Sequence, residues 1–158
     1  MVAFVGEYTC KLDHKGRMVV PVAIRKALSE AGESALVLQR NFHHDCINVY
    51  AKAQWIKMLS GFQTSHSVLS ERESSFIREF NRGSAEVEPD ESSGRILIPR
   101  KLLDRIGARD EVVLVGQGLK LEIWEKKRYE EVECPPGDTA RMASEMHERL
   151  CRPRDERP

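Results

Sequence analysis

The order of apolar and polar positions is the same in two parts of this chain. Residues 16–21, with the sequence Gly-Arg-Met-Val-Val-Pro, recur as Gly-Arg-Ile-Leu-Ile-Pro at 94–99, an offset of 78 residues. In both places a short helical pattern follows, and two strand patterns come after the helix. The sequence therefore predicts two copies of one module, each running strand, turn, strand, helix, strand, strand.

The helix of each module has its apolar side chains on one face. Ile24 and Leu28 share a face after Pro21, whose missing N–H costs little at a helix start, and Gly32 ends the pattern. The second helix ends at Gly107 and carries the apolar stripe Leu102, Leu103 and Ile106. Each module thus has one short helix with an apolar face to bury.

Two strand patterns complete each module. Residues 35–39 and 46–50 of the first copy match 112–115 and 119–124 of the second. The last segment, Leu-Lys-Leu-Glu-Ile-Trp, alternates with the period of two that a half-buried strand requires. A module of about 50 residues is small for an independent core. We therefore expect a mixed α/β fold, mostly β, in which the modules interdigitate around one barrel-like core with flanking helices.

The segment between the modules has helical patterns of its own. One covers residues 53–59. Another follows the capping box Ser70-x-x-Glu73 and has Phe76, Ile77 and Phe80 on its apolar side. The expected boundaries are 4–52 for the first module, 53–81 for the connecting helices and 82–130 for the second module.

Residues 131–158 are expected to form a flexible tail. The stretch Cys134-Pro135-Pro136-Gly137 breaks regular structure. Asp138 can cap the N-terminus of a helix that follows it. The apolar positions of this helix are Met142, Met146 and Leu150. The final residues, 152–158, should be loose.

Composition is typical of a soluble globular protein. Of the 158 residues, 41% are hydrophobic and 32% are charged, and the longest apolar runs fall far short of the ~20 residues that a membrane span needs. No basic stretch precedes an apolar core at the N-terminus, so we expect no signal peptide. The expected location is the cytoplasm, with no membrane partner.

Charge is balanced over the chain but not along it. The formal net charge is zero, so any affinity for nucleic acid has to come from local charge. Residues 11–26 hold five basic side chains against one acidic side chain, which gives +4. Residues 86–91 hold four acidic side chains and no basic one, which gives −4. The first module therefore has the stronger local attraction for a polyanion.

Residue types that carry metal or enzyme chemistry are poorly arranged. The chain lacks a Cys-x-x-Cys pair, and neither Cys10-x-x-x-His14 nor residues 43–46 offer the two close ligand pairs of structural zinc. Gly-rich phosphate loops, Gly-x-Ser-x-Gly and His-Glu-x-x-His are also missing. We expect no metal, no cofactor, no small-molecule substrate and no catalytic residue, and reduced thiols at Cys10, Cys46, Cys134 and Cys151.

The turn Asp13-His14-Lys15-Gly16-Arg17 has a pattern suited to anion recognition. Gly16 can adopt the positive φ of a tight turn. The Asp13 carboxylate can accept guanidinium hydrogen bonds from Arg17, which then presents its remaining donors to a guanine edge or a phosphate. Lys15 at the tip adds a charge for the DNA backbone. The alternative is that the Asp13–Arg17 pair merely closes a hairpin.

Two signatures in these modules resemble a known family. The pattern G-E-Y-T-x-x-L-D-x-K-G-R-x-x-x-P at 6–21 resembles the opening signature of MraZ proteins, and V-L-V-G-Q-x-x-K-x-E-x-W at 113–124 is similar to their second-half signature. The resemblance covers residues 4–130. It implies the swapped-hairpin barrel of AbrB-like regulators, ring-shaped homo-oligomers, and repression of the division and cell-wall gene cluster that contains the regulator's own gene.

The resemblance also implies which residues contact DNA. The family signature is Asp-x-x-x-Arg, once per module, and the segment from Asp13 to Arg17 matches it fully. In the second module the residue four before Arg95 is Glu91, with Asp90 one position earlier. Either Glu91 orients Arg95 with its longer side chain, or the turn holds one extra residue and uses Asp90.

Further basic residues lie near these signatures. Lys11 precedes the first turn and His14 lies within it, and both are expected to contact DNA. Arg25 and Arg100, each followed by a lysine, sit near helix starts, where they either reach phosphates or are simply solvated. The aromatic residues follow strand and helix patterns away from basic clusters, so we expect them in the core or in subunit contacts: Phe42, Tyr50, Trp55, Trp124 and Tyr129.

The expected function is sequence-specific binding of double-stranded promoter DNA by a nucleoid-associated homo-oligomer that represses transcription. An AbrB-like antitoxin or another regulator of the same fold is the alternative, although a single module is usual for antitoxins. A purely structural ring is a third class, which would tolerate loss of Arg17 and Arg95.

Overall fold

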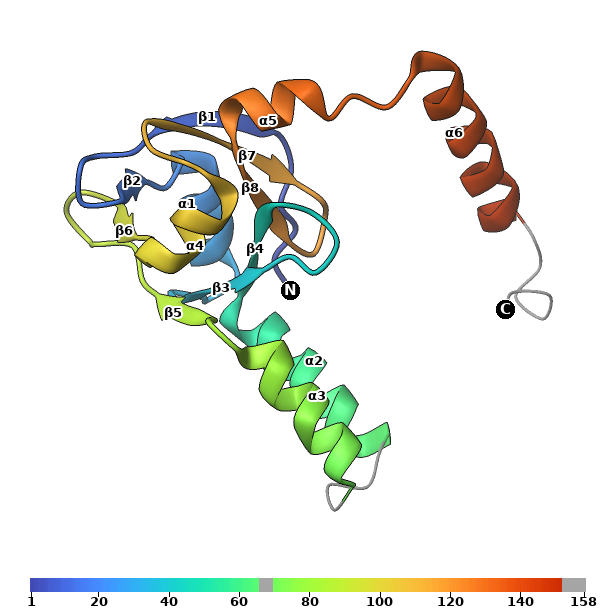
Figure 1. Cartoon of the computed structure of the whole chain (residues 1–158), viewed down its shortest axis with the longest axis horizontal. Coiled ribbons are helices and arrows are strands. Elements are labelled where there is room, and N and C mark those ends of the chain that lie inside the picture. The colour runs from blue at the N-terminus through green and yellow to red at the C-terminus, as the bar shows by residue number, and fades with distance from the viewer. Residues whose placement is uncertain (66–69, 152–158) are drawn as a thin grey trace. The chain divides into compact units, whose positions relative to one another are not determined.

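The strand patterns of both modules meet in one six-stranded antiparallel sheet. The computed structural model describes residues 1–65 and 70–151 (Figure 1). The strand order in this sheet is β1-β7-β8-β4-β3-β5. Its strands are β1 (Glu7–Lys11), β3 (Leu36–Arg40), β4 (Cys46–Ala51), β5 (Ala85–Val87), β7 (Glu111–Gly116) and β8 (Leu121–Glu125).

Each module gives its first strand to the other module. β1 pairs with β7, placing Glu7 opposite Val115, and β5 pairs with β3, placing Val87 opposite Leu36. The two second strands, β2 (Arg17–Val19) and β6 (Arg95–Leu97), pair with each other in a separate two-stranded sheet. The expectation that the modules interdigitate in a mixed α/β fold is confirmed. The fold is not mostly β, because helices cover more of the described residues than strands do.

The six-stranded sheet is not closed into a barrel, which corrects one part of the expected architecture. β1 and β5 are its edge strands in the described part of the chain. The strands that would have to close it, β2 and β6, have three residues each and pair with one another instead. Pro21 and Pro99 follow them closely and cannot donate to a strand ladder, so neither strand extends further.

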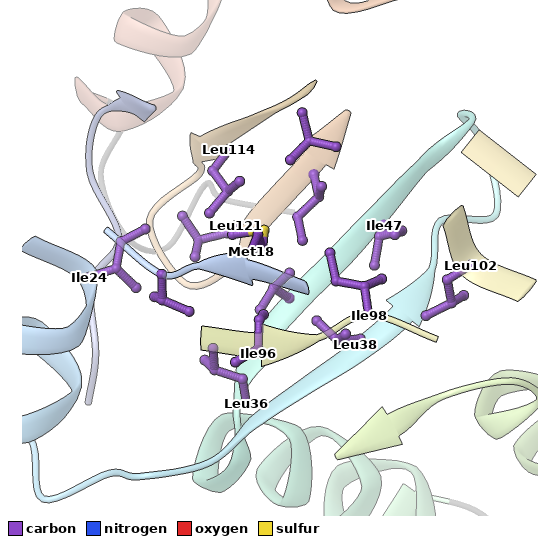
Figure 2. Close-up of a cluster of buried hydrophobic side chains, with 14 of the residues drawn as sticks. Met18, Ile24, Leu36, Leu38, Ile47, Ile96, Ile98, Leu102, Leu114 and Leu121 are labelled. Carbon is purple, nitrogen blue, oxygen red and sulfur yellow. The ribbon is translucent and has the colours of Figure 1, made fainter. Parts of the chain in front are cut away.

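One face of the sheet packs against β2, β6 and two helices. These are α1 (Val22–Glu30) and α4 (Arg100–Ile106), and the latter ends at Gly107 with a φ of 71°. Alternate residues of the strands point into this core, as the period of two predicted. Figure 2 shows side chains from both modules gathered in this core, among them Met18, Ile24, Leu38, Ile47, Ile96, Ile98, Leu102, Leu114 and Leu121.

The connecting segment forms two helices that lie side by side, α2 (Lys52–Ser65) and α3 (Glu71–Asn81) (Figure 1). They pack on the sheet through Trp55 and Phe80, whose rings stack 5.0 Å apart over Val37. Both helices were expected from the sequence. Ser70 is the N-cap residue of α3, but its hydroxyl makes no capping hydrogen bond.

The chain divides into a unit of residues 1–127 and a second unit that begins at Arg128. The helix α5 (Lys126–Glu131) spans this boundary, and the second unit contains α6 (Pro136–Cys151). α6 is the helix expected in the tail, and its apolar stripe of Met142, Met146 and Leu150 is exposed. The loose end expected at 152–158 lies outside the described residues. No helix within residues 1–65 and 70–151 is long and apolar enough to span a bilayer.

Candidate nucleic-acid interface

Turn 1, residues 13–17, is closed by the Asp13 carboxylate. One of its oxygens, Oδ1, accepts hydrogen bonds from the backbone N–H groups of Lys15 and Arg17, each at 2.9 Å. The other, Oδ2, accepts one from Arg17 Nε at 2.7 Å. The backbone N–H of Arg17 first, and then its guanidinium, lower the pKa of Asp13 to about 2. Asp13 is therefore charged at neutral pH and holds the guanidinium by its inner nitrogen.

This arrangement leaves the two terminal nitrogens of the Arg17 guanidinium available to a ligand. In the described part of the chain, no group other than Asp13 makes a side-chain hydrogen bond or ion pair with Arg17. The Arg17 side chain is 40% exposed. An arginine bonded through Nε alone keeps both terminal nitrogens for a second acceptor pair. The geometry suits recognition of a guanine edge or a phosphate.

Turn 2, residues 90–95, has one residue more than turn 1. Asp13 N donates to Arg17 O at 2.9 Å in turn 1, and Asp90 N donates to Arg95 O at 2.9 Å in turn 2. Asp90 therefore occupies the position of Asp13, as the alternative with an extra residue required. Glu91 lies one residue further into the turn, with an exposed side chain.

The two aspartates differ in what they bind. Asp90 Oδ1 accepts hydrogen bonds from the hydroxyls of Ser92 at 2.7 Å and Ser93 at 2.9 Å, and from both backbone N–H groups. The Ser92 hydroxyl first, and then Ser93, lower the pKa of Asp90 to about 2. Among residues 1–65 and 70–151, no carboxylate forms an ion pair with Arg95. The backbone of turn 2 follows the alternative with the extra residue, and orientation of Arg95 by Glu91 or Asp90 stays a prediction.

Arg25 brings a positive charge from the first module to turn 2 of the second. Its Nε donates to the Val20 carbonyl oxygen at 3.0 Å. Its guanidinium also covers Gly94, because a Cβ built on that glycine would lie 2.8 Å from Arg25 Cζ. The corresponding residue of the second module is Leu103, which covers Gly16 in the same way, at 2.8 Å. Each turn is therefore packed against the helix of the other module.

The two short strands, called the ribbon from here on, have one buried and one outward face. Met18 and Ile96 point into the core and are buried. The outward positions are Arg17 and Val19 on β2 and Arg95 and Leu97 on β6, with Arg17 opposite Leu97 and Val19 opposite Arg95. The two arginines are thus diagonal neighbours on one face.

The remaining predicted residues surround the ribbon less closely. His14 and Lys15 lie exposed at the tip of turn 1. Lys11 ends β1, opposite Glu111, and lines a shallow groove of about 590 Å³ together with Val19. Arg100 is the first residue of α4 and is exposed. The structure therefore brings Arg17, Arg95 and Arg25 together at the ribbon and its turns, with Lys11, His14 and Lys15 at its border.

A buried polar network on the other face of the sheet was not foreseen from the sequence. Lys120 Nζ donates to Glu122 Oε1 at 2.9 Å and to Asn48 Oδ1 at 3.0 Å, and Trp124 Nε1 donates to Glu122 Oε2 at 3.0 Å. The Glu122 side chain is only 7% exposed. Three of these residues are the last three specified positions of the second signature, and the bond to Asn48 joins β8 to β4. The only signal in the sequence was polar residues at alternate positions of a strand.

The side chains that could bind a metal ion are scattered over the described residues. Within residues 1–65 and 70–151, no group of three or more His, Cys, Asp and Glu residues lies close enough to hold an ion. The four cysteines form no disulfide. Burial raises the pKa of the Cys46 thiol to about 12, so this thiol stays protonated at neutral pH.

Comparison with known proteins places both modules in one family. The family model of MraZ proteins, whose description also likens them to antitoxins, matches residues 3–76 and 80–137. A protein of Christiangramia forsetii named transcriptional regulator MraZ is 33% identical over 150 residues, covering 92% of this chain and 94% of that protein. Proteins of the same name from Cytophaga hutchinsonii and Dictyoglomus turgidum are each 38% identical, over 80% and 81% of this chain and 82% and 83% of their own lengths. The chain belongs to the MraZ family.

Proposed function

We propose that this chain is a sequence-specific transcriptional regulator that binds double-stranded promoter DNA through the ribbon. It represses the division and cell-wall gene cluster that contains its own gene. It acts in the cytoplasm, in association with the nucleoid, as a ring-shaped homo-oligomer without enzyme activity. The names of the relatives, all transcriptional regulators, support this class of function.

One observation supports DNA binding above all others: the ribbon presents two arginines on a single outward face. The B-DNA major groove is about 12 Å wide and admits a two-stranded β-ribbon. Arg17 is fixed through Nε by Asp13 before any ligand is bound, so ordering it on DNA costs less side-chain entropy. A pre-oriented guanidinium is suited to the O6 and N7 atoms of guanine.

Basic residues around the ribbon support a role for the DNA backbone. Lys15 and His14 extend from the tip of turn 1, and Lys11 follows at the end of β1. Arg25 adds one positive charge near turn 2, although the acidic residues there outnumber it. Two of these acidic residues have polar partners: Glu86 pairs with Lys52 at 2.7 Å, and Glu88 accepts a hydrogen bond from the Ser34 hydroxyl at 3.4 Å. In this scheme phosphate contacts position the ribbon and base contacts give specificity.

Self-association is part of the proposal because one ribbon makes few contacts. Several ribbons in one assembly, bound to repeated short sites, multiply a weak single affinity through effective concentration. Exposed apolar side chains on the connecting helices support such contacts, since Ile56 and Phe76 are each 51% exposed. Light scattering should give a mass several times that of the 18.1 kDa chain, and a monomer at micromolar concentration would contradict this.

The experiment that tests DNA binding is a titration of arginine variants. Fluorescence anisotropy is measured on a duplex from upstream of the protein's own gene and on a scrambled duplex, at two salt concentrations. Arg17→Ala should lose specific binding, because a bidentate base contact contributes about 1–3 kcal/mol at each engaged subunit. Arg95→Ala should lose less, because acidic residues surround turn 2. Lys15→Ala should weaken both duplexes alike and flatten the salt dependence.

The matched control is Arg82→Ala, at the C-terminal end of α3. Arg82 pairs with Glu79 at 2.7 Å, and its side chain is 65% exposed. This variant removes an exposed arginine that is not on the ribbon, so it should bind both duplexes as the wild type does. If Arg17→Ala and Arg95→Ala both bind like the wild type, the ring is structural or the DNA lies elsewhere. Binding by the wild type to a co-purifying toxin and not to DNA would favour the antitoxin alternative.

A further inference from the structure

The outward face of the ribbon holds two apolar side chains beside the arginines. Val19 is 44% exposed and Leu97 is 55% exposed. They occupy the same position in the two modules, since the repeat offset of 78 residues joins them. Each lies directly opposite an arginine of the other strand. A single exposed apolar residue needs no explanation, but two at equivalent positions of one small charged face call for a ligand with apolar groups.

We propose that Val19 and Leu97 are specificity-determining residues that contact the 5-methyl groups of thymine in the major groove. This rests on the proposed DNA binding by the ribbon. The thymine methyl is the one apolar group that the major-groove edge of a base pair presents, and apolar side chains recognise it. The ribbon then distinguishes two kinds of base pair, with arginine on guanine and Val19 or Leu97 on thymine.

The dimensions of the ribbon fix how far apart the two kinds of contact lie. Directly opposite residues on an antiparallel pair are about 4.5–5.5 Å apart, and residues two apart on one strand are about 6.6–6.8 Å apart. Successive bases on a DNA strand are about 3.4 Å apart along the helix axis. Each apolar side chain therefore reaches a base pair one or two steps from the guanine contacted by an arginine. Sites for this protein should contain thymine at that spacing.

The competing explanation is that these side chains make contacts between subunits. Val19 also lines the groove beside β1, together with Tyr8 and Lys11. That groove has a lysine at its border and lies next to the arginines. Glu7 also lines the groove, but Lys11, Arg17 and Arg95 together leave this face net positive, which favours a polyanion over a second copy of the same surface. A role in self-association is nevertheless one outcome that the experiment must separate.

The test uses a DNA probe that lacks only the methyl group. Duplexes are selected from a random library with the full-length protein, and each thymine of the selected sequence is replaced in turn by deoxyuridine. Wild-type protein should bind about four-fold more weakly at each contacted thymine, the factor for losing one buried CH₂-sized group. Val19→Ala and Leu97→Ala should each bind thymine and deoxyuridine duplexes equally at their own position. Val22→Ala, another exposed valine at 69% but on α1, should keep the wild-type ratio.

The outcomes separate this inference from the proposed function. If the wild type selects no sequence at all, DNA binding itself is refuted. If it selects a sequence that Arg17→Ala no longer binds, while every deoxyuridine duplex binds as well as thymine, the methyl contact is refuted and DNA binding stands. If Val19→Ala and Leu97→Ala lower the assembly mass in light scattering and leave the thymine-to-deoxyuridine ratio unchanged, the two residues serve self-association and the inference is refuted.

Discussion

Replacing Gly94 by alanine should separate the role of turn 2 in DNA binding from its role in stability. Gly94 has a φ of +67°, and a left-handed backbone costs an alanine about 1–2 kcal/mol. A Cβ there would also lie 2.8 Å from Arg25 Cζ, so the guanidinium has to move. The move breaks the half-exposed hydrogen bond from Arg25 to Val20 O, worth about 1 kcal/mol more. Gly94→Ala should therefore lose about 2–3 kcal/mol of unfolding free energy.

Gly32→Ala is the matched control for this variant. Gly32 has a φ of +70°, and a Cβ there would meet nothing within 4 Å. It should lose only the ~1–2 kcal/mol of the left-handed backbone. Urea unfolding, followed by tryptophan fluorescence, gives the stabilities, and anisotropy gives the DNA affinities. Gly94→Ala should bind upstream DNA more weakly because Arg25 has left turn 2, whereas Gly32→Ala should bind normally. Equal DNA affinities for the two variants would refute the assignment of Arg25 to the interface.

Three further outcomes are expected. Leu38→Ala, at a fully buried core position, should lower the unfolding free energy by about 2–5 kcal/mol in urea, and a loss below 1 kcal/mol would argue against the core. Because the fold lowers the pKa of Asp13 from 3.8 to about 2, the contribution of its charge to stability is complete above about pH 5 and is lost as the pH falls through 2. The stability difference between wild type and Asp13→Asn should shrink over that range, and a constant difference would contradict this. Iodoacetamide at pH 8 should modify the exposed Cys134 well before the buried Cys46, as mass spectrometry would show.

The local structure of each module could be predicted from the sequence because it depends on neighbouring residues. Alternation fixed which side chains of 121–124 face the core, and the glycine after Ile106 marked where α4 ends. The repeat also indicated two modules in one core. The prediction that the sheet closes into a barrel was wrong. Closure depends on the length and pairing of β2 and β6, and both of these depend on contacts between the modules.

The candidate interface was predictable only in part, because some of its contacts join residues of different modules. Asp13 and Arg17 are close in the chain, so their pairing followed from spacing alone. The extra residue of turn 2, which gives Asp90 the position of Asp13, left two alternatives that only the backbone hydrogen bonds separate. The packing of Arg25 on Gly94 joins residues of different modules, and a single sequence carries no signal for it.

Amide hydrogen exchange, with and without a duplex from upstream of the protein's own gene, can locate the surface that binds DNA. It reports on every backbone N–H and needs no substitution. If the ribbon binds DNA, the duplex should slow exchange in residues 13–19 and 90–97, the ribbon with its turns, while α2 and α3 exchange as before. Slower exchange on α2 and α3, with the ribbon and both turns unchanged, would contradict DNA binding by the ribbon.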